Sequence, residues 1–178
     1  MKIIVAGAGK VGYTVAEQLA EEHHDVTVID SNPDKISRAS NDLDVICIEG
    51  NGASFELLDE AGVRTADMLI AATGQDEVNM VCCMAARKLG TKYTVARIRS
   101  PEYLSQGEFL RETLGLSMAI NPDLEAAAEI SRILQFPTAA RVETFSHGSV
   151  DMVTYRIPKG SKLGGVPLRH LSDKFRGR

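Results

Sequence analysis

Short apolar runs alternate with amphipathic segments along the first three quarters of this 178-residue chain. The apolar runs are rich in Val and Ile and lack polar alternation, which is typical of parallel strands buried on both faces. We expect six strands, at residues 2–6, 26–29, 45–48, 68–72, 93–98 and 118–120. The segments between them predict helices over residues 11–22, 33–41, 54–61, 76–89 and 101–114.

Repeated strand–helix alternation predicts right-handed crossovers between parallel strands. The fold class is therefore α/β, a doubly wound parallel sheet of the Rossmann type covered by helices on both faces. Helix-start signals support the assignment, because Asn32 and Ser100 precede Pro33 and Pro101 at first-turn positions. Gly90 stands where the helix over 76–89 should end.

A further helix is expected over residues 122–135, and its pattern differs from the others. Its apolar side chains surround most of the helix, which is typical of a helix buried on several sides. They are Leu124, Ala126, Ala127, Ala128, Ile130, Ile133 and Leu134. Two interpretations remain open: the helix packs on a partner chain as well as on its own sheet, or it simply uses Ala for its high helix propensity.

After Pro137 the pattern changes to a period of two. Residues 141–145 and 150–157, separated by a turn at 147–149, predict a β-hairpin. Residues 156–178 carry seven Lys/Arg and one acid, whereas residues 1–155 carry thirteen Lys/Arg and 23 acids. A basic tail can contact nucleic acid or lipid, but the spaced leucines of 163–171 favour a truncated second domain. We therefore expect domains over 1–135 and 161–178, joined by a linker and hairpin over 136–160.

The net charge of −4 argues against nucleic acid as a partner, because binding the phosphate backbone needs clustered Lys/Arg. No apolar stretch approaches the ~18 residues of a membrane span, and the first residues lack a signal-peptide pattern. We therefore expect a soluble, cytoplasmic protein. Cys47, Cys82 and Cys83 form no Cys-x-x-Cys pair and have no basic cluster beside them, so we expect small buried apolar side chains rather than reactive thiols.

The first predicted strand runs directly into a glycine turn that opens the first helix, Gly7-Ala8-Gly9-Lys10-Val11-Gly12. Gly7 permits the tight turn, Gly9 lets the backbone approach a pyrophosphate, and Gly12 allows close helix–strand packing. The helix N-terminus offers free N–H groups to an anion. The next strand ends in Asp30, which can accept hydrogen bonds from both ribose hydroxyls and would repel a 2′-phosphate. The motif thus favours NAD(H), or an adenine nucleotide with a free ribose, over NADP.

Other candidates lie at the carboxyl ends of later strands, where open α/β sheets bind their ligands. Asn51, between two glycines, follows the third strand and can border an adenine. Thr73 and Gly74 follow the fourth strand and can reach the ribose or the phosphates.

Charged residues cluster beside these positions. Asp76 and Glu77 open a helix, where acids are expected from capping and the helix dipole alone, so Asn79 is the more informative neighbour. Arg97 and Arg99 alternate on the fifth strand, and a cation at a buried strand end needs an anionic partner. Either a phosphate or a carboxylate on a neighbouring helix would serve.

Together these features resemble the RCK/KTN domain family. The resemblance rests on the glycine turn, on Asp30, on Ala72-Thr73 before Asp76-Glu77-Val78-Asn79, and on Val95-Ala96-Arg97-Ile98-Arg99-Ser100-Pro101-Glu102-Tyr103. It covers residues 1–135 strongly, which would make them the family's Rossmann-like nucleotide-binding N-terminal domain. Residues 161–171 resemble the beginning of the family's small C-terminal domain, cut short here.

The resemblance implies a regulatory subunit that controls potassium uptake by a membrane-embedded Trk-type transporter. Such a subunit would be a homodimer or higher homo-oligomer held at the inner face of the membrane by its partner. Family members bind NAD(H), and several bind ATP or ADP in the same cleft. The ligand contacts carried over by motif are Gly7, Ala8, Gly9, Lys10, Val11, Gly12, Asp30, Thr73, Gly74 and Arg97. Lys10 takes a variable position facing the phosphates, and Asp123 matches an acidic position near the dimer seam.

An NAD-dependent oxidoreductase fragment is the alternative reading, and an interaction scaffold with an unused glycine turn is a third. Hydride transfer needs a substrate domain and an acid–base group near the nicotinamide. His23 and His24 lie at the opposite sheet edge, and only 43 residues follow Gln135. We therefore expect a ligand-sensing domain that is not an enzyme.

Overall fold

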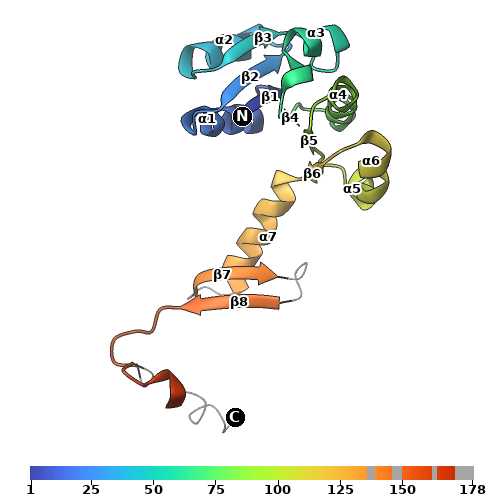
Figure 1. The fold of residues 1–178 in the computed structure, drawn as a ribbon. Coiled ribbons are helices and arrows are strands. Elements are labelled where there is room, and N and C mark those ends of the chain that lie inside the picture. Colours follow the sequence, from blue (N-terminus) through green and yellow to red (C-terminus); the bar gives the residue numbers. More distant parts are fainter. Residues whose placement is uncertain (136–138, 146–149, 162–163, 171–178) are drawn as a thin grey trace. The chain divides into compact units, whose positions relative to one another are not determined.

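The computed structural model describes residues 1–135, 139–145, 150–161 and 164–170 (Figure 1). These residues form two compact units, Met1–Asp123 and Leu124–Arg178.

The first unit is built on six parallel strands in the order β3-β2-β1-β4-β5-β6. The strands are β1 (Lys2–Ala6), β2 (Asp25–Asp30), β3 (Ile46–Glu49), β4 (Met68–Ala71), β5 (Tyr93–Arg97) and β6 (Met118–Ile120). The order reverses between β1 and β4, which creates a crevice at the carboxyl ends of these two strands. The predicted α/β, Rossmann-type sheet is confirmed.

Helices connect the strands nearly where the sequence predicts them. They are α1 (Lys10–Glu21), α2 (Pro33–Asp42), α3 (Phe55–Glu60), α4 (Asp76–Leu89), α5 (Pro101–Ser105), α6 (Gly107–Leu114) and α7 (Pro122–Gln135), with a 3₁₀ turn η1 (Val63–Thr65). The single helix expected over 101–114 is wrong, because the chain breaks at Gln106 into α5 and α6. Gly107 follows the break, and glycine is a poor residue for a helix interior.

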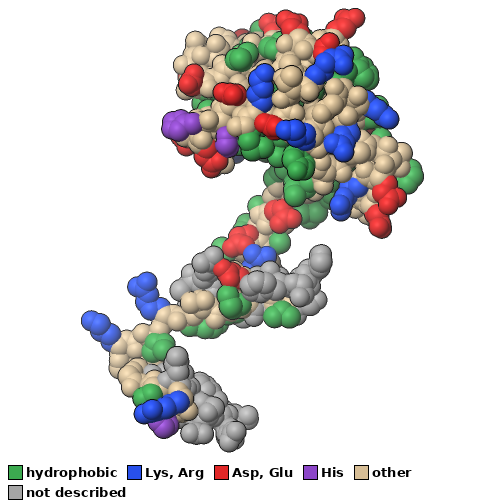
Figure 2. Space-filling model, viewed as in Figure 1, with side chains coloured by type: hydrophobic (Ala, Val, Ile, Leu, Met, Phe, Trp, Pro, Cys, Tyr) green, Lys and Arg blue, Asp and Glu red, His purple; other side chains and the backbone are tan. Residues whose placement is uncertain are grey.

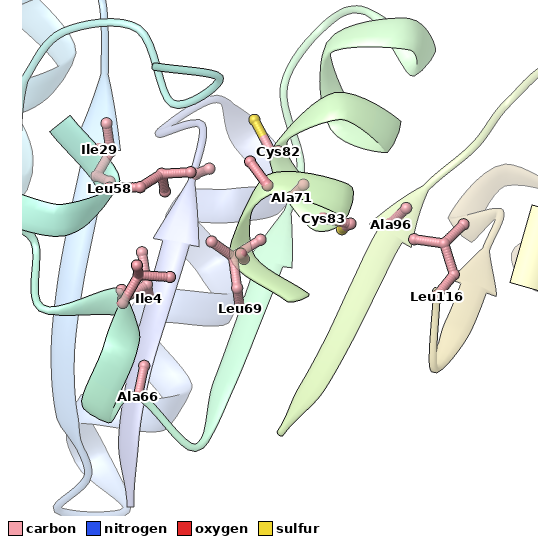
Figure 3. Close-up of a cluster of buried hydrophobic side chains, with 14 of the residues drawn as sticks. Ile4, Ile29, Leu58, Ala66, Leu69, Ala71, Cys82, Cys83, Ala96 and Leu116 are labelled. Atoms are coloured by element: carbon pink, nitrogen blue, oxygen red, sulfur yellow. The ribbon is translucent and has the colours of Figure 1, made fainter. Parts of the chain in front are cut away.

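Two buried clusters lie on opposite faces of the sheet, and adjacent strand residues alternate between them. Ile4 belongs to the cluster shared with α3, α4 and α6, while Val5 packs with Ala16 of α1 on the other face. Figure 3 shows the first cluster, in which Leu69 and Ala96 project from their strands toward Cys83 of α4. This burial fixes both sheet faces and holds the strand ends in register.

The expectation that every strand is buried on both faces is wrong at the sheet margins. Ile46 at the start of the edge strand β3 is 66% exposed, and Tyr93 and Met118 are each 54% exposed. Ile46 and Met118 belong to the edge strands β3 and β6, which have one neighbour each, and Tyr93 is the first residue of β5. On α4 the apolar Val81 is exposed, whereas the polar Asn79 is fully buried.

The three cysteines behave as the sequence predicts. Cys82 and Cys83 are buried and Cys47 is half-buried, and none forms a disulfide. Burial raises the pKa of Cys82 to about 12, so its thiol stays neutral near pH 7. The pKa values of the other two are also raised by burial. These are packing side chains.

The second unit contains most of α7, followed by the antiparallel strands β7 (Ala139–Phe145) and β8 (Val150–Tyr155) and a 3₁₀ turn η3 (Leu168–His170). The predicted hairpin is confirmed, and its expected turn at 147–149 lies outside the described residues. Arg156 and Lys159, which follow β8, are exposed. Figure 2 shows Lys and Arg side chains on the surface of this unit.

Candidate functional site

The turn between β1 and α1 has the geometry that its glycines predict. Gly7 adopts a φ of +104°, and a Cβ there would lie 2.7 Å from the Thr73 amide nitrogen. A Cβ on Gly12 would lie 1.8 Å from the Gly7 carbonyl oxygen, so α1 can approach the turn only without a side chain. A Cβ on Gly9 would meet nothing within 4 Å. Gly9 thus leaves open space in front of the α1 N-terminus.

That space belongs to a pocket of about 650 Å³ at the carboxyl ends of the strands. This volume lies within the range of small-molecule sites. The pocket brings together nine of the residues predicted from the sequence: Gly7, Gly9, Lys10, Val11, Asp30, Asn51, Thr73, Gly74 and Arg97. Ala8 and Gly12 do not line it, because the Ala8 side chain is buried and Gly12 packs against the Gly7 carbonyl.

Asp30 is held at the mouth of the crevice by backbone donors. Its Oδ2 accepts a hydrogen bond from the Ala8 N–H at 2.7 Å, and its Oδ1 accepts one from the Asn32 N–H at 2.9 Å. The Lys35 ammonium also lies 3.3 Å from Oδ2. The Ala8 backbone therefore orients Asp30 instead of facing a ligand.

A fully buried amide connects the ends of β4 and β5. Asn79 Oδ1 accepts hydrogen bonds from the Thr73 N–H at 2.8 Å and from the Thr73 hydroxyl at 2.6 Å. Asn79 Nδ2 donates to the Arg97 carbonyl at 2.8 Å. One side chain thus fixes two pocket-lining segments relative to each other.

Arg97 is the least solvated cation of the pocket. Its side chain is 16% exposed, and its buried Nε has no hydrogen-bond partner among the described residues. Its Nη2 lies 3.9 Å from Asp123 Oδ2 in the first turn of α7, which is longer than a hydrogen bond. Asp123 is itself 75% exposed. Arg97 therefore keeps hydrogen-bonding capacity for a further anion.

Arg99, in contrast, already has a carboxylate partner, Asp76. Its Nε lies 3.7 Å from Asp76 Oδ1, and its guanidinium donates to the Gly74 carbonyl. Asp76 Oδ2 accepts from the N–H groups of Arg99 and Ser100, both at 2.8 Å. The helix dipole alone would explain an acid at this position, but Asp76 also ties α4 to the segment after β5.

Sequence reasoning missed Lys35, which also lines the pocket. Its position in the sequence could have indicated this role, because a lysine in the first turn of the helix after Asp30 can reach back to the end of the strand. The sequence indicates Asn79 as an informative residue. Its burial and its hydrogen bonds to two strand ends, however, depend on long-range packing that no local pattern shows.

The residues present fit a nucleotide. The N-cap Gly9 has no side chain to cap α1, so the first N–H groups of that helix remain available to phosphate oxygens. Lys10 and Arg97 supply positive charge beside them, and Asp30 supplies carboxylate oxygens for hydroxyl groups. A second pocket, of about 370 Å³, lies at the amino ends of β1 and β2, away from the glycine turn between β1 and α1.

This geometry defines a Rossmann-like domain whose crevice is suited to nucleotides. The chain matches the TrkA-N domain model over residues 3–122, and it belongs to that family.

Curated relatives agree with this assignment. The chain is 40% identical over 171 residues to the Trk system potassium uptake protein TrkA homolog of Archaeoglobus fulgidus, covering 96% of this chain and 39% of the relative. It is 38% identical over 176 residues to the Trk system potassium uptake protein TrkA of Vibrio alginolyticus, covering 97% of this chain and 38% of the relative. The chain thus spans about two fifths of the length of these relatives.

Solved structures share the fold at lower identity. The TrkA-N domain of inner membrane protein ybaL from Escherichia coli superposes with a TM-score of 0.67 at 19% identity, covering 75% of this chain and 96% of that one. The GsuK channel bound to NAD gives a TM-score of 0.58 at 22% identity, over 80% of this chain and 24% of that one. GsuK bound to ADP gives 0.57 at 22% identity, over 67% and 31%.

Within the described residues, no helix has the length and apolar character needed to cross a bilayer.

Proposed function

We propose that this chain is a nucleotide-sensing regulatory domain that controls potassium uptake by a Trk-type membrane transporter. The names of its TrkA relatives support the transport role. The pocket supports the nucleotide role, because a glycine turn, an oriented carboxylate and an arginine meet in one crevice, and the buried Nε of that arginine has no hydrogen-bond partner in the described part of the chain. The domain would lie at the cytoplasmic face of the membrane through its transporter partner.

NAD(H), ADP and ATP are the ligands that this pocket suits. The N–H groups at the start of α1 would bind the phosphates, with Lys10 and Arg97 as counter-charges. Asp30 would accept hydrogen bonds from the ribose hydroxyls, and Asn51 would border the base. When bound, the nucleotide would bring negative phosphate charge next to Lys10 and Arg97, and the amount of that charge would be the regulatory signal. The NAD and ADP complexes of GsuK support the choice of ligands at the level of the fold.

A regulatory role is favoured over catalysis by the chemistry of the pocket wall. Among the described residues that line it, the ionisable side chains are Lys10, Asp30, Lys35, Arg97 and Asp123. Each of them suits the binding of phosphate or ribose, and no histidine is among the described residues that line the pocket to exchange a proton with a substrate. The alternative, an NAD-dependent oxidoreductase fragment, has no such support.

The protein would act as a homodimer or higher oligomer through α7. Four large apolar side chains of this helix are more than half exposed in the single chain: Leu124, Ile130, Ile133 and Leu134. Exposed apolar surface gathered on one helix marks interaction sites, and a second copy of this helix would cover it. The hairpin region over 136–160 would link this helix to the start of the C-terminal domain at 161–178.

The pocket and α7 meet at one ion pair. Arg97 borders the pocket, and Asp123 of the first turn of α7 lies 3.9 Å from it. A phosphate that binds Arg97 would compete with Asp123, so ligands of different phosphate charge would bias the start of α7 differently. A nucleotide shifts such an equilibrium only by its differential affinity for the two arrangements, and ~1–3 kcal/mol of coupling is typical.

Calorimetry of the purified protein with NADH, NAD, ADP and ATP tests the proposal. At least one ligand should bind without being turned over, and Asp30→Ala should weaken it by about 1.5–3 kcal/mol, the value of a hydrogen bond to a charged group. Asp34→Ala is the matched control, since this exposed carboxylate lies on the next helix outside the pocket. No binding up to millimolar concentration would refute the nucleotide role.

A further inference from the structure

The carboxylate of Asp30 has two kinds of donor. The N–H groups of Ala8 and Asn32 bind one oxygen each, and both belong to the backbone of fixed turns. The third donor is the Lys35 ammonium, 3.3 Å from Oδ2, on a side chain that is 45% exposed. The Asp30 side chain is only 9% exposed. Among the described residues, Lys35 is therefore the one donor to Asp30 that can move away.

The position of Lys35 is itself defined by local structure. The Asn32 side chain caps α2 by accepting hydrogen bonds from the N–H groups of Asp34 and Lys35, at 2.9 and 3.4 Å. The backbone of Lys35 is thus held one short turn from Asp30, and its flexible stem reaches the carboxylate from the pocket wall.

Lys35 competes with a ribose hydroxyl for an acceptor site on Asp30, as a count of the carboxylate lone pairs shows. A carboxylate offers about four acceptor sites, two on each oxygen. A ribose diol bound by both oxygens needs one site on Oδ1 and one on Oδ2. Oδ2 already accepts from the Ala8 N–H and from Lys35, so a ribose hydroxyl can take its place there only when the ammonium withdraws.

The same ammonium changes the charge that a ribose 2′ substituent meets. Asp30 alone repels a 2′-phosphate, which is why its position at the end of β2 favours NAD over NADP. Lys35 offsets the negative charge of this carboxylate while it stays beside Oδ2, and as a cation in the pocket wall it can also pair with the phosphate.

We propose that Lys35 is the residue that determines specificity at the ribose 2′ position, and that it allows this pocket to accept 2′-phosphorylated adenosine nucleotides beside unphosphorylated ones. This inference rests on the proposed nucleotide-binding function. It differs from the expectation drawn from Asp30 alone, because the acid and the lysine act as a pair.

The test compares two ligands that differ only at the 2′ position, 5′-AMP and adenosine 2′,5′-bisphosphate, by calorimetry on the full chain. The wild-type affinities should agree within about tenfold. Lys35→Met should weaken the bisphosphate by at least about tenfold. The affinity of the same variant for 5′-AMP should equal that of the wild type or be a few-fold higher, because Lys35 no longer competes with the ribose for Asp30. Lys35→Met should likewise weaken the binding of NADPH and leave the affinity for NADH unchanged or slightly higher.

Arg38→Met is the matched control. It removes the same charge from the same helix, but Arg38 stacks 4.3 Å from the centre of the Tyr13 ring and pairs with Asp42 at 3.6 Å. It should leave the ratio of the two affinities at the wild-type value.

Equal weakening of both ligands by Lys35→Met would assign Lys35 to the 5′-phosphate and overturn the proposal. No change in either ligand, or a wild-type preference for 5′-AMP of more than about a hundredfold, would overturn it as well. If the wild-type protein binds neither adenosine ligand nor a dinucleotide, the proposed function itself fails and this inference falls with it.

Discussion

Alanine replacements of two glycines in the β1–α1 turn, Gly9 and Gly12, should have different effects: the first should impair ligand binding and the second should impair stability. Gly9 has a φ of −69°, which any residue adopts, and a methyl group there meets nothing within 4 Å. Gly9→Ala should therefore change the free energy of unfolding by less than about 1 kcal/mol, as the small Ncap loss and the reduced freedom of the unfolded chain oppose each other. The new methyl group would, however, stand in the pocket.

Gly12→Ala should do the opposite. Its Cβ would lie 1.8 Å from the Gly7 carbonyl oxygen, far inside van der Waals contact and against backbone that cannot rotate away. The turn and α1 must then move apart, which should lower the free energy of unfolding by at least the ~1–3 kcal/mol of an overpacked core. Such a loss is a large fraction of the ~5–15 kcal/mol that stabilises a typical domain.

Urea unfolding followed by circular dichroism measures the stability of each variant, and calorimetry measures its affinity for the nucleotide. Gly9→Ala should fold normally and lose at least about tenfold in affinity, or ~1.4 kcal/mol. Gly107→Ala is the control, since its Cβ also meets nothing within 4 Å and it lies outside the pocket. Normal affinity in Gly9→Ala would place the phosphates elsewhere, and an unperturbed Gly12→Ala would refute the packing argument.

Three further predictions concern the buried amide, one surface carboxylate and α7. Asn79→Ala should lower the free energy of unfolding by about 2–5 kcal/mol, because it leaves the Thr73 N–H and the Arg97 carbonyl unpaired; a loss below ~1 kcal/mol in urea would contradict this. The hydrogen bond from Lys92 and that from the Lys2 N–H lower the pKa of Asp67 below its ordinary 3.8. Because the folded-state pKa of Asp67 lies below the unfolded-state value, the charged carboxylate stabilises the fold above the unfolded-state pKa, and this contribution is lost as the pH falls through the folded-state pKa. The stability difference between the wild type and Asp67→Asn in urea titrations should therefore be full at neutral pH and shrink as the pH falls below 3.8; a difference that does not change with pH would exclude this linkage. Ile133→Asp should dissociate the oligomer without unfolding the chain, while Ser131→Asp should not; a wild-type monomer by light scattering at micromolar concentration would remove the proposed interface.

Sequence periodicity was sufficient to predict the sheet. Strands β1 and β6 and helices α4 and α7 have the predicted bounds, because a parallel sheet buried between helices leaves an unmistakable apolar pattern. The break at Gln106 and the exposed Ile46 were not predictable in the same way, since both depend on where a neighbouring element ends. Local pattern gives the type of an element more reliably than its margins.

For the candidate site, the division follows the range of the interactions. The sequence alone determined the glycine turn and the acid at the end of β2, because each is a local motif whose spacing carries its geometry. Only the tertiary structure decided which cation pairs with which anion: Arg99 with Asp76, Arg97 weakly with Asp123, and Lys35 with Asp30. These pairs join residues from different elements. Their distances are set by the packing of those elements, and a local sequence pattern contains no information about that packing.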